Sequence, residues 1–210
     1  MNKKGYSILV LCVSFILPSF ANSYTHAQMA TQEQVYFEDF ESELAIGWDL
    51  QEGWEIIVEE GNRILSGQEH AWANSNQSFQ NYSLSFRLKL LKDDIHLIFN
   101  MNEEGRYFIN FNSSGSRLNK QYWPNTFIED LSSSNIQHPQ NKWVDVEIIS
   151  QDSNFSLIVN GITEWTFTDP EPLNSGSFAF ETLENSQAYI DDIVVSINMP
   201  TEQPTHIPIE

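Results

Sequence analysis

Polar and apolar side chains alternate along three short segments between Tyr82 and Asn112. If the apolar positions face a core, the positions between them share one outer face. Because the chain has only 10 Lys and Arg residues, three of them on one such face form a local concentration of positive charge. The outward positions are Arg87, Lys89, His96, Asn100, Arg106, Phe108, Asn110 and Asn112.

This combination of side chains is typical of sugar-binding surfaces. Aromatic rings stack on the C–H faces of a sugar, while amide and guanidinium groups hydrogen-bond its hydroxyls. The alternative interpretation is the polar outer side that any half-exposed sheet presents. The predicted polar contacts are Arg87, His96, Asn100, Arg106 and Asn110, and the predicted stacking residues are Trp72, Tyr122 and Trp123.

The carboxylates give a weaker indication of catalysis. Sandwich-shaped retaining glycosidases place closely spaced acids on one strand face, in a Glu-x-Asp-x-x-Glu run that this sequence lacks. The sequence also lacks Gly-x-Ser-x-Gly, a glycine-rich phosphate loop and His-Glu-x-x-His. Glu181, in the string FETLE, remains the candidate for a catalytic acid–base.

Adjacent acids near both ends of the domain suggest a cation. They occur in the strings VYFEDFES and AYIDDIVVS, and such acids repel each other unless solvent or a cation neutralises them. Calcium takes carboxylate and carbonyl oxygens. We therefore predict a structural calcium held by Asp39, Asp191 and Asp192, with ordinary surface acids as the equal alternative.

The elements that must position these residues are β-strands. Apolar and polar residues alternate at period two from residue 35 to 197, interrupted by Asn, Gly, Ser and Asp turns, and no stretch shows a convincing helical period. The three segments between Tyr82 and Asn112 are predicted as consecutive strands of one meander. Short antiparallel strands at this spacing pack as two sheets. The sequence therefore predicts one all-β domain over 35–197, a two-sheet antiparallel sandwich of jelly-roll type.

Charge and termini limit the classes of partner. The 29 acidic residues against 10 basic ones give a formal charge of −19, which disfavours nucleic acid as a partner. Lys3 and Lys4 precede a short apolar run that is too short for a transmembrane helix, so the N-terminus is predicted to be a signal peptide cleaved after Ala21 or Ala27. We predict a secreted protein, extracellular or periplasmic, with no transmembrane segment in the mature chain. Residues 198–210 are predicted to be a Pro- and Thr-containing tail.

Three strings carry a resemblance to known proteins: GWEIIVEEGNRILSG, YSLSFRLKLLKDDIHLIFNMNEEGRYFINFN and GSFAFETLENSQAYIDDIVVS. They resemble the concanavalin A-like, laminin-G-like jelly-roll modules of secreted bacterial proteins. The sequence is particularly similar to the family named for 3-keto-disaccharide hydrolases, which is related to family 16 glycosidases. The resemblance covers about Val35 to Ile197 and implies carbohydrate binding or glycoside processing on a concave sheet.

The predicted function is that of a secreted module that binds a saccharide on its concave sheet. One alternative is a glycoside hydrolase-like enzyme acting on a keto-disaccharide or another glycan. The other alternative is a cell-surface adhesion or interaction module. A pair of acids facing a pocket, one with a raised pKa, would favour the enzyme. An aromatic groove without such a pair would favour binding.

Overall fold

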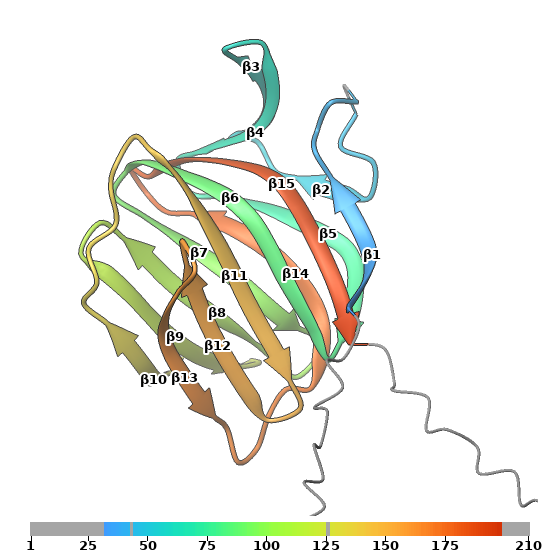
Figure 1. Cartoon of the computed structure of the whole chain (residues 1–210), viewed down its shortest axis with the longest axis vertical. Helices are drawn as coiled ribbons and strands as arrows, with labels where there is room; N and C mark the ends of the chain where they lie inside the picture. The colour runs from blue at the N-terminus through green and yellow to red at the C-terminus, as the bar shows by residue number, and fades with distance from the viewer. Residues whose placement is uncertain (1–31, 43, 125–126, 199–210) are drawn as a thin grey trace, which may run out of the picture.

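The computed structural model describes residues 32–42, 44–124 and 127–198, and within them the chain forms fifteen β-strands and no helix. The strands build two antiparallel sheets that stack face to face, as Figure 1 shows. The predicted two-sheet sandwich is therefore confirmed. The predicted signal peptide lies outside the described residues, as does the predicted tail from residue 199 onward. The described part of the chain contains no helix of the length and apolarity needed to cross a membrane.

One sheet has eight strands. Its path places β6 in the middle, between β11 and β15, and β1 also pairs with β15. The hairpin of β3 and β4 projects from the body of the sandwich (Figure 1). In spatial order the strands are β13 (Ile162–Thr168), β12 (Asn154–Val159), β11 (Trp143–Gln151), β6 (Tyr82–Lys92), β15 (Gln187–Asn198), β4 (Asn62–Gln68) and β3 (Trp54–Glu59), with β1 (Gln32–Glu38) beside β15.

The other sheet has seven strands, and its outer face carries the candidate site described below. Strand β14 lies between β5 and β7, so the chain returns from near its C-terminus to the middle of this sheet. In spatial order the strands are β10 (Ile128–Ser134), β9 (Gly115–Tyr122), β8 (Gly105–Asn112), β7 (Asp94–Met101), β14 (Ser175–Thr182), β5 (Ala71–Gln80) and β2 (Trp48–Leu50).

Aromatic side chains fill much of the space between the sheets. Phe180 contacts Trp48 at a centroid distance of 5.9 Å and Phe86 at 5.0 Å, which links β14 to both sheets. Apolar burial on this scale supplies the main driving force for folding. The six positions predicted to face the core are all buried, namely Leu84, Phe86, Leu97, Phe99, Ile109 and Phe111.

The predicted three-strand meander is wrong in one respect. Strands β7 and β8 pair as expected, but β6 lies in the opposite sheet and pairs with β11 and β15. Only Asp93, with a φ of 53°, separates β6 from β7, so the chain crosses there from one sheet to the other. Both β6 and β7 bury alternate residues in the same core. A period of two therefore does not distinguish this crossing from a hairpin.

Candidate functional site

Strand register places five polar or aromatic side chains in one row across the seven-stranded sheet. Trp72 of β5 lies opposite Glu181 of β14, and Glu181 lies opposite His96 of β7. The row continues through Asn110 of β8 to Arg117 of β9. Alternate residues of each strand face the core, so these five share the outer face, which we call the site face.

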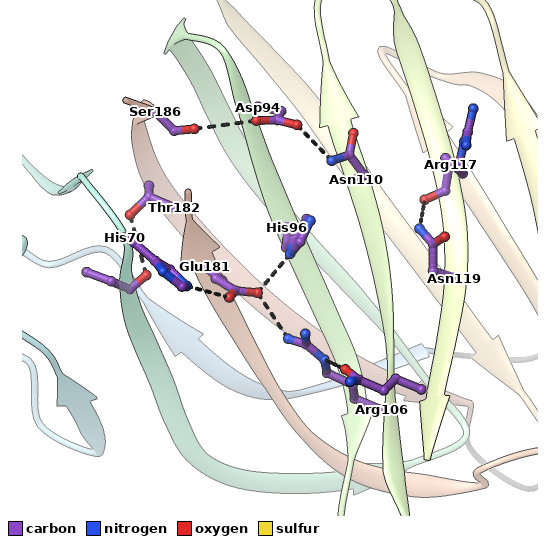
Figure 2. Close-up of polar contacts among 12 residues, drawn as sticks. His70, Asp94, His96, Arg106, Asn110, Arg117, Asn119, Glu181, Thr182 and Ser186 are labelled. Carbon is purple, nitrogen blue, oxygen red and sulfur yellow. Dashed lines mark hydrogen bonds and ion pairs between the residues drawn. The ribbon is translucent and has the colours of Figure 1, made fainter. Parts of the chain in front are cut away.

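Glu181 is the centre of a buried ion-pair cluster on the site face. Its Oε2 lies 2.8 Å from His96 Nδ1 and 3.0 Å from Nη1 of Arg106, and its Oε1 lies 3.1 Å from His70 Nε2. These three contacts are visible in Figure 2, where the two rings and the guanidinium converge on the carboxylate from different strands. Glu181 is only 5 % exposed, and both of its carboxylate oxygens have hydrogen-bond partners.

This environment favours the ionised form of Glu181. Burial acts to raise its pKa, but the hydrogen bond and charge of His96 and the charge of Arg106 outweigh burial and hold the pKa below its ordinary value. An ionised carboxylate only accepts hydrogen bonds. The facing nitrogens, Nδ1 of His96 and Nε2 of His70, therefore carry hydrogen.

Arg106 is held by aromatic rings as well as by its ion pair. Its guanidinium lies 4.8 Å from the ring centroid of Trp72, 4.7 Å from that of Phe108 and 5.8 Å from that of Trp123. Its Nε donates to Gln121 Oε1 at 3.0 Å. Planar stacking and fork-shaped donation are the contacts that a guanidinium makes best. Arg106 is therefore a buried structural part of the site face rather than a freely exposed hydrogen-bond donor.

A cleft of about 430 Å³ opens beside this cluster, bounded by residues of β7, β8, β9 and β10. Its wall includes the edge of His96, the ring of Phe108 and a series of amide and hydroxyl side chains. Gly115 shapes this wall, because a Cβ at its φ of 151° would lie 2.1 Å from the carbonyl oxygen of Ser134. The polar lining includes Asn110, Asn112, Asn119, Asn135, Ser133 and Ser134.

The amides of the cleft orient one another. Asn110 Nδ2 donates to Asp94 Oδ2 at 2.8 Å, and Asn112 Nδ2 donates to Asn110 Oδ1 at 3.2 Å. Figure 2 shows Asp94 between Asn110 and Ser186. Groups fixed in this way lose little conformational entropy when they bind a ligand. The cleft is thus a polar surface with a preset arrangement of donors and acceptors.

Comparison with protein families identifies the domain. Residues 36–196 match the model of the 3-keto-alpha-glucoside-1,2-lyase-like domain. The chain belongs to this family. The predicted resemblance is thereby confirmed. A comparison with curated protein sequences gives no match.

Solved structures show the same fold at low sequence identity. Carbohydrate-binding module CBM66 from Bacillus subtilis is 12% identical, with a TM-score of 0.58 over 70% of this chain and 93% of that one. A Bacillus subtilis protein of unknown function with a galectin-like fold is 12% identical, with a TM-score of 0.67 over 81% and 100%. A family 16 endo-glucanase from Bacteroides ovatus is 10% identical, with a TM-score of 0.61 over 76% and 99%. The lyase-like domain therefore has a concanavalin A-like jelly-roll fold.

Four of the predicted ligand contacts, and the predicted acid, meet on the site face of this lyase-like domain. His96 and Arg106 contact Glu181 directly, and Trp72 lies under the guanidinium of Arg106. Asn110 lines the cleft. Trp123 stands at the edge of the cluster, 40 % exposed, with its Nε1 donating to the carbonyl oxygen of Asn102 at 3.0 Å.

Three other predicted contacts lie elsewhere. Arg87 follows β6 into the eight-stranded sheet, where its guanidinium lies 4.7 Å from the Trp143 ring centroid. Asn100 points into the core and donates to Ser150 Oγ at 2.9 Å, because its φ of 47° and a register irregularity interrupt the alternation of β7. Tyr122 has the opposite parity to Gln121 and contacts Lys120, with a distance of 4.7 Å from Nζ to the ring centroid.

The acids predicted to bind calcium have other partners in the structure. Asp191 Oδ2 accepts from Asn62 Nδ2 at 2.8 Å, and Asp39 Oδ1 accepts from the backbone N–H of Glu41 at 3.1 Å. Arg87 Nη1 lies 3.4 Å from Asp192 Oδ2. Within the described ranges, no group of three or more His, Cys, Asp or Glu side chains is placed to hold a metal ion. The calcium site stays a prediction.

Sequence reasoning missed several residues of the site. His70 precedes β5 and lies two residues before Trp72, so the same parity brings it to Glu181. Asn119 and Gln121 lie on the site face because β9 extends the β7–β8 pair. The alternation RLNKQY, residues 117–122, was the available signal for both. It becomes visible only when β9 is assigned to the same sheet.

Proposed function

We propose that this protein is a secreted carbohydrate-binding module and that it holds a saccharide in the cleft of the site face. The observation that carries the proposal is the preset pair of cleft amides, Asn110 and Asn112, which the Asp94 carboxylate holds in place. Sugars present several hydroxyls in a fixed arrangement, and the amides of this wall offer donors and acceptors for them. The solved neighbours named as a carbohydrate-binding module and an endo-glucanase support the same class of ligand.

The state of Glu181 favours binding over glycoside hydrolysis by an acid pair. A general acid at neutral pH needs a raised pKa, and that of Glu181 is lowered. The carboxylate is also occupied by Arg106 and two histidines. Its chemistry is to keep the imidazoles and the guanidinium in place next to the cleft.

Two asparagines provide a matched test of this proposal. Asn110 donates to Asp94 at 2.8 Å on the site face, and Asn62 donates to Asp191 at 2.8 Å on the other sheet. Asn110→Ala should weaken binding of the saccharide that gives the strongest glycan-array signal by about 5- to 150-fold, as expected for about 1–3 kcal/mol of lost hydrogen bonding. Asn62→Ala should leave the affinity measured by isothermal titration calorimetry unchanged. Absence of any glycan signal, or equal losses in both variants, would contradict the proposal.

A second candidate function is elimination on a 3-keto-α-glucoside, and the His96–Glu181 contact favours it. Because Glu181 holds the Nδ1 hydrogen, Nε2 of His96 is the nitrogen that can act as a base whenever the ring is neutral, and His96 lines the cleft. Such a base removes the C2 proton, which the adjacent 3-keto group acidifies. The C1–O bond then breaks, a C1–C2 double bond forms, and the departing oxygen takes up the proton.

A chromogenic 3-keto-α-glucoside with a nitrophenyl leaving group tests this second function. Turnover that falls by about 100-fold or more in His96→Asn, with the KM little changed, is the result expected of a general base. A wild-type protein that binds the compound and releases no nitrophenol would restrict the function to binding.

A further inference from the structure

A second cavity, of about 750 Å³, lies beside the site face and is larger than the cleft. It is formed where the ends of β4 and β6 meet the β14–β15 turn. Its lining includes Gln68, His70, Lys92, Ser186 and Gln187. The lining also contains three glutamates, namely Glu52, Glu69 and Glu184.

Two short hydrogen-bonded bridges separate the two cavities. In one, Glu181 contacts His96, which lines the cleft, and His70, which lines the second cavity. In the other, Asp94 accepts from Asn110 on the cleft side and from Ser186 Oγ, at 3.5 Å, on the side of the second cavity. Figure 2 shows the bridges side by side, with Glu181 and Asp94 as their middle members. Each bridge is only one carboxylate side chain wide at its middle.

We propose that the second cavity is a subsite for a further sugar ring and that it selects against carboxylated sugars. This inference rests on the proposed function, since it extends the saccharide from the cleft across Glu181 and Asp94. The ligand is then an oligosaccharide of at least two rings, one ring in each cavity. Gln68, Gln187 and Ser186 supply amide and hydroxyl groups that suit sugar hydroxyls.

Charge determines which sugars enter the second cavity. Its lining holds three glutamates and one lysine, in a chain whose formal charge is −19. On the bridge itself, the positive charge of Arg106 is already matched by Glu181. A uronic acid in the second cavity meets three glutamates against the single Lys92, so net Coulomb repulsion opposes its binding. Neutral rings pay no such penalty.

An array of matched oligosaccharides tests the proposal. It holds gluco-, manno-, galacto- and fructo-oligosaccharides of one to four rings, with uronic acid versions of the same linkages. The protein should bind two rings at least about 5-fold more tightly than one, the gain of a single net hydrogen bond. Neutral members should exceed their uronate counterparts. If every array member fails to bind, the proposed function itself is wrong. If one ring binds as tightly as two, or uronates bind as well as neutral sugars, only the second subsite is wrong.

Variants at the second cavity sharpen the test. Gln68→Ala should reduce the advantage of two rings over one and leave one-ring binding unchanged, whereas Gln80→Ala at the far end of β5 should change neither. Glu69→Gln combined with Glu184→Gln should raise uronate binding relative to neutral sugars, and more so at low salt. Identical ratios in the wild type and in both cavity variants would overturn the proposal. All four positions are exposed, so the variants retain the fold.

Discussion

Glu181 and Asp191 are buried carboxylates on the outer faces of opposite sheets, and their pKa values shift in opposite directions. Glu181, on the seven-stranded sheet, is 5 % exposed, and Asp191, on the eight-stranded sheet, is 2 % exposed. The pKa of Glu181 lies below its ordinary value despite burial, whereas burial raises the pKa of Asp191 above its ordinary value. Similar burial therefore accompanies opposite shifts of the pKa.

The difference between the two pKa shifts comes from the hydrogen-bond and charge partners of each carboxylate rather than from how deeply it is buried. Glu181 has Arg106 at 3.0 Å and two imidazoles within 3.1 Å. Asp191 accepts from neutral donors, the Asn62 amide and the Asp192 backbone N–H, and the guanidinium of Arg87 lies 3.8 Å away. Burying a charged cluster carries a desolvation cost, and strongly perturbed carboxylates with specific charged partners are frequent at functional sites. The comparison therefore directs attention to the site face.

The largest expected effect is the contrast between removing the two charges. Glu181→Gln leaves Arg106 and two imidazoles without a matching anion and should lower the free energy of unfolding by about 3–5 kcal/mol. Asp191→Asn loses one acceptor but is relieved of a buried charge, so it should change stability by no more than about 1 kcal/mol. Urea unfolding at neutral pH measures both. Equal losses would show that depth alone controls these sites.

The two arginines give the next contrast. Arg106→Lys removes a stacked guanidinium that also donates to Gln121, and it should cost about 2 kcal/mol. Arg87→Lys changes a side chain that is 38 % exposed, so its cost should stay below about 1 kcal/mol. Thermal unfolding of the pair, checked by circular dichroism for retained strand structure, distinguishes them. A larger loss for Arg87→Lys would reverse the comparison.

The pH dependence should differ in sign between the two carboxylates. Because the folded pKa of Glu181 is lowered from 4.5, its stabilisation is complete above that value and is lost as the pH falls through the folded pKa. The deficit of Glu181→Gln should therefore shrink as the pH falls below about 4.5. The folded pKa of Asp191 is raised from 3.8, so its charge penalty appears as the pH rises. Asp191→Asn should thus become relatively more stable on raising the pH, and parallel profiles for the two variants would be inconsistent with this difference.

The smallest expected effect concerns calcium at the chain ends. Asp191 already accepts from Asn62 and from the backbone N–H of Asp192, so any ion shared with Asp39 would be bound weakly. Chelator should lower the melting temperature only slightly, as mass action requires for a weak ligand. Asp191→Asn should abolish that response. A melting curve that chelator does not move would leave the three acids as ordinary surface groups.

Alternation along single strands was sufficient to predict part of the site. His96 and Asn110 are outward residues on β7 and β8, which are adjacent in the sequence and also paired in space, so their common face followed from period two. The prediction for Arg87 was wrong because the chain crosses at Asp93, so that β6 lies in the other sheet. The prediction for Asn100 was wrong because an irregularity in the pairing of β7 with β14 turns its side chain toward the core. The predicted role of Glu181 rested on residue type, and nothing local indicated the three groups that surround it.

The sequence by itself determined the strand pattern, the aromatic core and the acidic composition, because these depend on residue type and on the two-residue period of a strand. Only the tertiary structure decided which strands are neighbours. It placed β14, from late in the chain, between β5 and β7, and so brought Glu181 within hydrogen-bonding distance of His70, His96 and Arg106. Pairing between distant segments depends on the packing of the whole core, which no local period encodes. The charge state of Glu181, and with it the chemistry of the site face, follows from that pairing.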